Sequence, residues 1–394
     1  MTLQSNPRLF IKRDPCPLIR REGKVEVIKS MPEFLKQGPY YAHPRVRHHV
    51  LRRAKENLLE YDEERIEFPS SELYGVICDG PKALWSGWRS ALVQDPETKE
   101  LYRLKGISFL DKPEVRKHGD ALLVHGGQWA QNAQFEHSLS DRFNKVLQQE
   151  GIEPVMEHVG YYRYPIKTKG RKLAASIVRV KGDTRLDELL FVMENLAIKY
   201  IDKSSRLTYS QKDMFYQVLG DFYHEVGRAV GYLKQLMDKS GQTWSDNPER
   251  SNAHIGNVVL YQDVFEKVGI GLVDFDASCD KRDKTKSELA DQQKAEYESI
   301  IASAKGVDIS PRTIGNNWGN KLYISYPSRM WFIWGFEAGY DQNIPFSPNR
   351  SKLLLYSQID SLFEIFQHHL PRETDEFRQT YRYNTLENMV LKKI

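Results

Sequence analysis

The sequence predicts an α+β protein of two lobes, a smaller β-rich lobe with one long helix and a larger, mostly helical lobe. Strand-like runs concentrate between residues 71 and 182, whereas apolar stripes of helical period dominate residues 183–394. A short polar connector, Val180–Arg185, separates the two textures. We therefore expect a basic extension packing on the fold (1–70), a small lobe (71–182) and a large lobe (183–394) with a charged insert at 279–306. A cleft between lobes is a common place for a ligand.

Composition is that of an ordinary soluble globular protein. The 394 residues are 40% hydrophobic and 28% charged, and the net charge is +4, too small to favour nucleic acid as the partner. Three sparse cysteines, Cys16, Cys78 and Cys279, fit a reducing compartment and lack zinc-ligand spacing. The N-terminus lacks the apolar run of a secretory signal, and apolar stretches stay far below the ~20 residues of a membrane helix. We expect a cytoplasmic protein with no membrane partner.

The N-terminal extension carries a predicted basic helix over His43–Glu64. Five cationic or titratable side chains share a broad face of it: Arg45, His48, His49, Arg52 and Arg53. A nucleic-acid-contacting helix and a solvated surface helix both fit this pattern, and the solvated helix is favoured.

The small lobe is predicted from a hairpin, a helix and two further strands. Ala91–Gln94 and Leu101–Lys105 flank a polar turn. Within Gln128–Gly151, five residues form a stripe at helical spacing, and the glycine is a natural stop: Phe135, Leu139, Phe143, Val146 and Leu147. Two more strand-like runs follow, Val155–Tyr164 and Leu173–Val180.

The large lobe is predicted to be mainly helical. One helix covers Leu186–Ile201, and a longer one begins at Ser210, where Asp213 three residues on gives a weak capping-box start. Its core stripe runs from Phe215 to Met237. The charged insert should be partly helical, and two more helices are expected in the stretches YPSRMWFIWGFEAGYD and SKLLLYSQIDSLFEIFQHHL.

Asn257 and Asp274 are the candidate metal ligands. Two short strands, Val258–Leu260 and Gly271–Val273, would form a hairpin that brings both side chains to one end. A carboxamide and a carboxylate oxygen suit Mg²⁺, whose other ligands are waters and substrate phosphates. Asp276 would complete the acidic cluster. Singly, each residue also fits a structural role, Asn257 in a turn and Asp274 at a helix cap.

Lys105 and Glu136 are the candidate phosphate-binding pair. A strand fixes the direction of Lys105, and a lysine facing a ligand cleft needs an anion to hold it. Glu136, beside the apolar stripe of the next helix, is the obvious partner. Singly, a solvated lysine and a surface glutamate are the commoner interpretations.

A lysine on a strand, a glutamate on the next helix, and an asparagine and an aspartate flanking a hairpin follow one another in this chain. In this order and on these elements, the chain resembles the protein-kinase-like superfamily. SNAHIGNVVL…GLVDFDAS looks like the HGDxHxGN…IDF pattern of aminoglycoside phosphotransferase-like kinases. RLKG, GGQWAQNAQFEHSLSDRFNKVLQQEGIEP and SIVRVKGDTRLDEL are similar in layout to the selenoprotein O family, whose members transfer AMP from ATP to protein hydroxyls with a flipped nucleotide. The resemblance covers Ser71–Leu190 and Ser251–Ser278.

The resemblance implies roles for several residues. Lys105 and Glu136 would bind the phosphates of ATP, and Asn257 and Asp274 would bind Mg²⁺. Arg179 would contact a phosphate of a flipped nucleotide; a surface cation is the commoner interpretation. The connector from Val180 to Asp183 would present its backbone to adenine.

The general base departs from both patterns. Phosphotransferases carry an aspartate five residues before the metal asparagine, where this chain has Asn252, which cannot accept a proton near neutral pH. Selenoprotein O members use an acidic residue directly before that asparagine, where this chain has Gly256. His254 and Asp276 are the nearby proton acceptors.

Two functions therefore stay open at this point. One is an ATP- and Mg²⁺-dependent transferase that moves AMP or phosphate from the nucleoside triphosphate to a hydroxyl-bearing acceptor, protein or small molecule. The alternative is a catalytically silent pseudokinase, a nucleotide-binding interaction module, as Asn252 suggests. Binding of nucleic acid by the basic helix stays a third, less favoured hypothesis.

Overall fold

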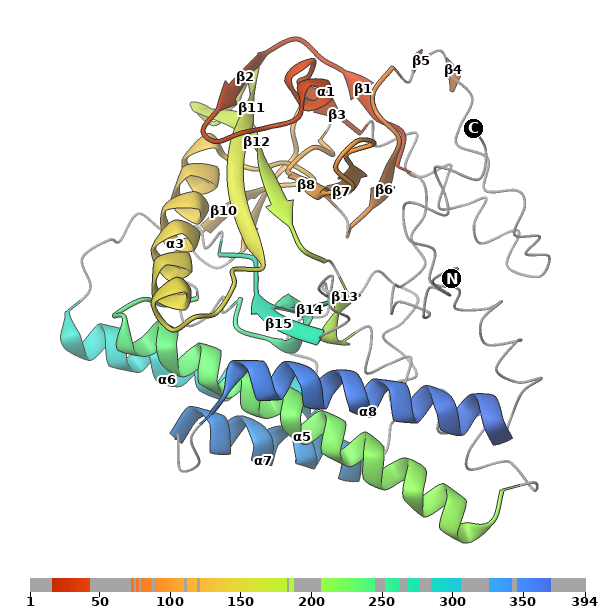
Figure 1. Ribbon diagram of the computed structural model, residues 1–394. Coiled ribbons are helices and arrows are strands. Elements are labelled where there is room, and N and C mark those ends of the chain that lie inside the picture. Colours follow the sequence, from red (N-terminus) through yellow and green to blue (C-terminus); the bar gives the residue numbers. More distant parts are fainter. Residues whose placement is uncertain are drawn as a thin grey trace.

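The protein combines antiparallel sheets with long helices (Figure 1). This is a computed structural model, and it describes residues 16–42, 72–73, 76–77, 79–86, 89–109, 112–118, 121–182, 184–187, 207–244, 252–262, 268–275, 285–305, 326–341 and 346–369. A mixed α and β structure was predicted, and the structure contains both. The division into lobes and the boundaries at residues 70 and 182 stay predictions.

The largest sheet has six strands in the order β2-β11-β12-β8-β7-β6, and every pair in it is antiparallel. The strands are β2 (Lys24–Val27), β11 (Met156–Thr168), β12 (Arg171–Val180), β8 (Leu101–Lys105), β7 (Ser90–Gln94) and β6 (Ala83–Trp85). The predicted hairpin is β7–β8. Lys169 and Gly170, both at positive φ, connect β11 to β12 in the conformation that two-residue hairpin turns require.

Helix α3 (Ala130–Gln149) covers one face of this sheet, as Figure 1 shows. It buries the predicted residues Leu139, Phe143 and Leu147, and Gly151 follows its end at φ +69°. These side chains belong to one apolar core with Leu92 and Val178 of the sheet and with residues of the helical half. Packing against α3 therefore joins the sheet to the rest of the molecule.

Residues 16–42 cover the opposite face of the sheet. They contain β1 (Ile19–Arg20), α1 (Glu33–Lys36) and β3 (Tyr40–Tyr41), and they contribute β2 to the sheet edge. The phenol of Tyr162 donates to the carbonyl of Leu35 at 2.9 Å, and the phenol of Tyr164 donates to the carbonyl of Tyr40 at 2.6 Å. The N-terminal segment thus closes a second apolar core.

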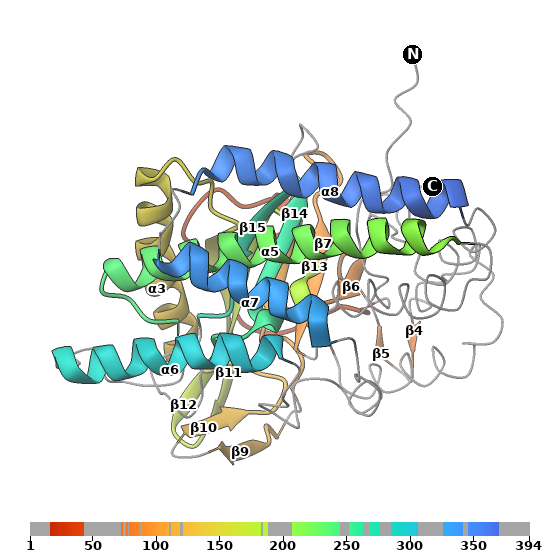
Figure 2. The ribbon, with the colours of Figure 1, turned by 90° about the horizontal axis from the view of Figure 1, so that it is seen from below.

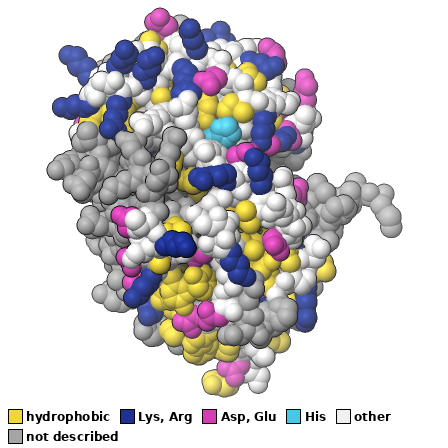
Figure 3. All heavy atoms as spheres, turned by 90° about the vertical axis from the view of Figure 1, so that its left-hand side faces the viewer, with side chains coloured by type: hydrophobic (Ala, Val, Ile, Leu, Met, Phe, Trp, Pro, Cys, Tyr) yellow, Lys and Arg dark blue, Asp and Glu magenta, His cyan; other side chains and the backbone are white. Residues whose placement is uncertain are grey.

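The sheet edge at β2 and the outer surface of α3 carry interleaved charges. Lys29 Nζ lies 2.9 Å from a carboxylate oxygen of Glu157 and 3.5 Å from one of Asp141, and Arg163 pairs with Glu26 at 2.7 Å. In Figure 3, Lys and Arg side chains on the upper part of that face have Asp and Glu side chains among them. Such exposed pairs contribute little to stability, about 0–1 kcal/mol each.

Small sheets complete the strand inventory of the described residues. One has the order β13-β14-β15 and lies between the large sheet and the helices (Figure 1). Its strands are β13 (Thr184–Arg185), β14 (Val258–Gln262) and β15 (Val268–Leu272). The others are the pairs β1–β3, β4 (Glu72–Leu73) with β5 (Val76–Ile77), and β9 (Val115–His118) with β10 (Ala121–Val124).

Long helices form the other half, and Figure 2 shows them lying side by side. They are α5 (Tyr209–Lys239), α6 (Lys286–Ala304), α7 (Tyr326–Asp341) and α8 (Pro348–His369). Helix α5 begins one residue earlier than predicted, and its capping box joins Thr208 with Gln211, not Ser210 with Asp213. The threonine hydroxyl reaches the amide of Gln211, so it forms the better cap.

Helices α5 and α7 cross closely because glycines line the crossing. A Cβ on Gly231 would lie 2.1 Å from the carbonyl oxygen of Phe336, and one on Gly339 would lie 2.1 Å from the carbonyl oxygen of Arg228. Because these glycines have no side chain, the backbone of each helix lies directly against that of the other.

Several predicted features lie outside the described residues. They are the basic helix His43–Glu64, most of the helix Leu186–Ile201, the proposed base Asp276 and the connector residue Asp183. Of the charged insert 279–306, the structure describes α6 and its cap Thr285.

Candidate functional site

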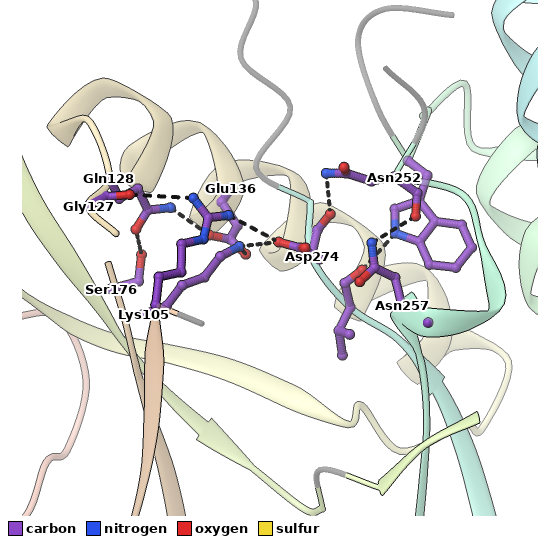
Figure 4. Close-up of polar contacts among 12 residues, drawn as sticks. Lys105, Gly127, Gln128, Glu136, Ser176, Asn252, Asn257 and Asp274 are labelled. Carbon is purple, nitrogen blue, oxygen red and sulfur yellow. Dashed lines mark hydrogen bonds and ion pairs between the residues drawn. The ribbon is translucent and has the colours of Figure 1, made fainter. Parts of the chain in front are cut away.

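Lys105 lies at the centre of the candidate site. Its Nζ is 2.7 Å from Oε1 of Glu136 and also bonds Oδ1 of Asp274 (Figure 4). The side chains of Lys105 and Glu136 are 7% and 3% exposed, whereas that of Asp274 is 25% exposed. A buried ammonium group is therefore balanced by one buried and one partly open carboxylate.

Secondary structure holds this lysine and its partner in place. Lys105 ends β8 between Ser90 of β7 and Ser176 of β12, and these three side chains share the sheet face that α3 covers. Glu136 lies on the buried side of α3 between the apolar contacts of that helix. The lysine cannot leave this face without moving the strand.

Two neutral side chains fix the carboxylate of Glu136. Gln128 Nε2 donates to Oε2 of Glu136 at 2.9 Å, and Ser176 Oγ donates to the amide oxygen of Gln128 at 3.0 Å. Both glutamate oxygens are thus bonded, one to Lys105 and one to Gln128, as a buried carboxylate requires.

Asn257 and Asp274 lie at one end of the β14–β15 hairpin, where the sequence predicted them. Val258 pairs with Leu272, and the amide of Val273 donates to the carbonyl of Asn257 at 3.0 Å. The indole of Trp244 donates to the carbonyl of Val273 at 2.7 Å. These bonds fix the backbone just before Asp274, which has φ +68°.

Asn252 connects two parts of this loop by hydrogen bonds. Its amide nitrogen donates to the backbone carbonyl of Asp274 at 2.8 Å, and its own carbonyl accepts from Nδ2 of Asn257 at 2.9 Å. Asn252 therefore connects the two candidate metal ligands through these hydrogen bonds. Its carboxamide offers no proton-accepting group of useful basicity.

The side-chain oxygens of Asn257 and Asp274 both accept hydrogen bonds from cationic groups, and that of Asp274 accepts from Lys105. Arg185 Nη1 donates to Oδ1 of Asn257 at 3.2 Å and to the carbonyl of Gly256 at 3.0 Å. Among the described residues, no cluster of three or more His, Cys, Asp or Glu side chains could hold a metal. Carboxamide and carboxylate oxygens are ligand types that Mg²⁺ takes together with phosphate oxygens and water.

His254 is a weak base in this position. Burial lowers its pKa to about 4 from an ordinary 6.5, although the negative charge of Asp274 acts in the opposite direction. Its Nε2 lies 3.2 Å from Nδ2 of Asn257. The imidazole is therefore neutral near pH 7 and belongs to the same network as the candidate metal ligands.

Arg179 lies away from Lys105. It pairs with Tyr102 across the β12–β8 ladder, so its side chain belongs to the opposite face of the sheet. There it bonds Glu157 and lies 3.1 Å from Oε1 of Glu100, and these pairings raise its pKa against the effect of burial. The structure does not bring this arginine to Lys105 and Glu136.

The connector begins inside the sheet. Val180 is 4% exposed and pairs with both Met156 and Leu101, and the amide of Lys181 donates to the carbonyl of Val155 at 3.0 Å. A Cβ on Gly182 would lie 2.8 Å from Cβ of Tyr261, so the connector runs directly against β14.

Sequence reasoning missed two charged residues of this site. Arg89 Nη2 lies 3.8 Å from Oδ1 of Asp274. Asp187 follows the connector. A Cβ on Gly256 would lie 2.9 Å from Oδ2 of Asp187 and 3.0 Å from Nδ1 of His254, so both side chains approach this glycine closely. Neither residue stands in a periodic pattern, and only tertiary structure brings them near the loop.

Comparisons with known proteins show only distant similarity. No family model and no curated protein matches the chain. A solved structure of WaaP in complex with acyl carrier protein is similar at 10% identity, over 73% of this chain and 89% of that one, with a TM-score of 0.31. Glucosamine kinase is similar in two structures. One, a crystal form, has 13% identity over 79% of this chain and 88% of that one, with a TM-score of 0.23.

The second structure of that kinase, in complex with glucosamine, ADP and inorganic phosphate, has 14% identity over 80% of this chain and 89% of that one, with a TM-score of 0.24. Of the helices in the described part of the chain, none is long and apolar enough to cross a membrane.

Proposed function

We propose that this protein binds ATP with Mg²⁺ and transfers a phosphoryl or adenylyl group to a hydroxyl-bearing acceptor, in the manner of kinase-like enzymes. One observation carries the proposal: a single buried lysine, Lys105, bonds Glu136 of a helix and Asp274 of a hairpin at once. In kinase-like sites, a lysine paired with a helix glutamate lies next to an aspartate that follows a hairpin, and these residues bind the nucleotide phosphates and their Mg²⁺.

Each side chain then has a defined task. Lys105 binds phosphate oxygens, and Glu136 keeps its ammonium group directed into the site. Asp274 and Asn257 would hold Mg²⁺, which when bound neutralises the charge of the phosphates. Asn252 positions Asp274 through the backbone. Val180 opens the connector that would face the adenine ring.

The proton acceptor is proposed to be a carboxylate. The pKa of His254 is lowered to about 4 by burial, and we assign the role to Asp276 because an aspartate accepts the proton in the kinase-like enzymes that the chain resembles. Replacement of Asp276 by alanine should abolish turnover and leave nucleotide affinity unchanged. Unchanged turnover in that variant would remove Asp276 from this role.

Nucleotide binding is the first test. Titration calorimetry should detect MgATP binding to the wild type, and Lys105→Met should weaken it by about tenfold or more, since a hydrogen bond to a charged group contributes about 1.5–3 kcal/mol. Lys172→Met, which changes an exposed lysine of β12, is the control and should bind as the wild type does. Absence of binding in the wild type would refute the proposal.

Labelled ATP separates the two reactions. Transfer of label from the α-phosphate to an acceptor shows adenylyl transfer, whereas transfer of label only from the γ-phosphate shows phosphoryl transfer. The same assay, with wild type and Asp274→Asn, links product formation to the candidate metal ligand.

A silent nucleotide-binding module is the second candidate function. The observation that favours it is the carboxamide of Asn252, which occupies the position of the phosphotransferase base and is bonded to the backbone. Stabilisation by MgATP without labelled product or released phosphate would support this function over catalysis. At a ligand concentration of 100 Kd, the stabilisation should be about 2.7 kcal/mol.

A further inference from the structure

A second cation, Arg89, lies beside Lys105 in the site. Its carbonyl accepts from the amide of Gly106 at 2.9 Å and from that of Ile107 at 3.2 Å, directly after the strand that ends in Lys105. Gly106 adopts φ +89°, a conformation that favours glycine, and this turn allows both contacts. The backbone of Arg89 is therefore fixed to the strand end that carries the phosphate-binding lysine.

The side chain of Arg89 extends to the same acceptor as Lys105. Its Nη2 lies 3.8 Å from Oδ1 of Asp274, the oxygen that Lys105 also bonds, and its Nη1 lies 3.5 Å from the carbonyl of Gly127. The side chain is 18% exposed, so most of its surface is removed from water. Two cations from adjacent strand ends thus converge on one carboxylate oxygen.

This arrangement suits a phosphate. An ammonium group and a guanidinium group reach the same part of the site, beside the carboxylate that Lys105 already bonds. A guanidinium carries five donors in a planar fork that matches two oxygens of one phosphate. A polyphosphate chain offers several such oxygens and can bond the arginine and the lysine at the same time.

We propose that Arg89 is a phosphate-binding residue that, together with Lys105, contacts the polyphosphate chain of the nucleotide. This inference rests on the proposed function and specifies its ligand, because two converging cations select nucleotides with more than one phosphate. Arg179, which the sequence suggested for a phosphate contact, lies on the opposite sheet face and does not take part.

The test compares Arg89→Gln with Arg179→Gln, the same change on the opposite face of the same sheet. Calorimetry measures the Kd of ATP, ADP and AMP, each with Mg²⁺ and with EDTA. We expect Arg89→Gln to weaken ATP binding by about tenfold to a hundredfold and AMP binding by less than about threefold, and Arg179→Gln to change neither. The contrast between nucleotides distinguishes a phosphate contact from general damage to the site.

Each other outcome is also decisive. Wild-type affinity for ATP in Arg89→Gln, or an equal loss of ATP and AMP, would overturn the role of Arg89 and leave the proposed function in place. Failure of the wild type to bind any of the three nucleotides would overturn both. If Arg89→Gln does not fold, Arg89→Lys, which keeps the charge beside Asp274 but loses the fork, should weaken ATP binding by about threefold or more. Unchanged ATP affinity in that variant would overturn the role.

Discussion

The buried pair of Lys105 and Glu136 makes a quantitative prediction about stability. Lys105→Met removes the cation and leaves the carboxylate of Glu136, 3% exposed, with Gln128 as its donor. Removing one partner of a buried ion pair costs about 3–5 kcal/mol. Glu136→Gln costs less, about 1–3 kcal/mol, because the lysine retains its bond to Asp274.

The double variant decides whether the two residues act as a pair. If the changes were independent, their costs would add to about 4–8 kcal/mol. In the double variant neither a buried ammonium nor its buried partner carboxylate remains unpaired, so we expect its cost to fall below the sum by about 1–3 kcal/mol.

Urea unfolding of the four proteins measures this coupling. Circular dichroism and tryptophan fluorescence should give the same midpoint, and the slope with urea should stay constant among the variants. Total stability of about 5–15 kcal/mol leaves the single variants measurable. Costs that add within about 0.5 kcal/mol, or a larger cost for Glu136→Gln than for Lys105→Met, would refute the pairing.

Three further predictions test the fold around the site. Gly231→Ala should destabilise the protein by about 1–3 kcal/mol because its Cβ meets the backbone of α7. Gly220→Ala in the same helix, whose Cβ meets only an indole, should be near neutral. Equal urea midpoints for the two variants would contradict this close crossing. Trp244→Phe should cost about 1–3 kcal/mol, since the carbonyl of Val273 loses its donor, and an unchanged Tm would contradict it. The pKa of His254 is lowered to about 4, so the unfolded chain takes up a proton at higher pH than the folded protein does. The free energy of unfolding should therefore fall as pH drops from about 6.5 towards 4, by up to about 1.4 kcal/mol per pH unit. In His254→Gln it should fall less steeply. Equal pH slopes for the two proteins would contradict this.

Local pattern was enough to place the elements that carry the site. Alternation and turn residues located the β7–β8 hairpin, and the stripe from Phe135 to Leu147 located α3. Glu136 was named from the sequence as the partner of Lys105, and the structure brings the two together, although the β9–β10 hairpin, which was not predicted, lies between β8 and α3. Their roles in binding a nucleotide stay predictions.

Features that depend on pairing across the chain could not be predicted in this way. Strand β2 is largely exposed, and its place at the sheet edge depends on β11. Arg89 reaches Asp274 only after the sheet and the hairpin have packed together. Arg179 shows the converse, because its position in a strand near the connector suggested the site, yet strand alternation directs its side chain to the other face.

Asp187 is a further candidate for the base beside His254 and Asp276, and it offers a test. A Cβ on Gly256 would lie 2.9 Å from Oδ2 of Asp187 and 3.0 Å from Nδ1 of His254, so this carboxylate stands beside the loop that carries Asn252 and Asn257. If this carboxylate accepts the proton, Asp187→Asn should lower turnover by about a hundredfold or more with the Kd of MgATP unchanged. If Asp276 accepts it, Asp276→Ala should show that loss and Asp187→Asn should not. Weakened MgATP binding in Asp187→Asn would instead show that Asp187 acts on the nucleotide, because a base for the acceptor has no effect on ATP affinity.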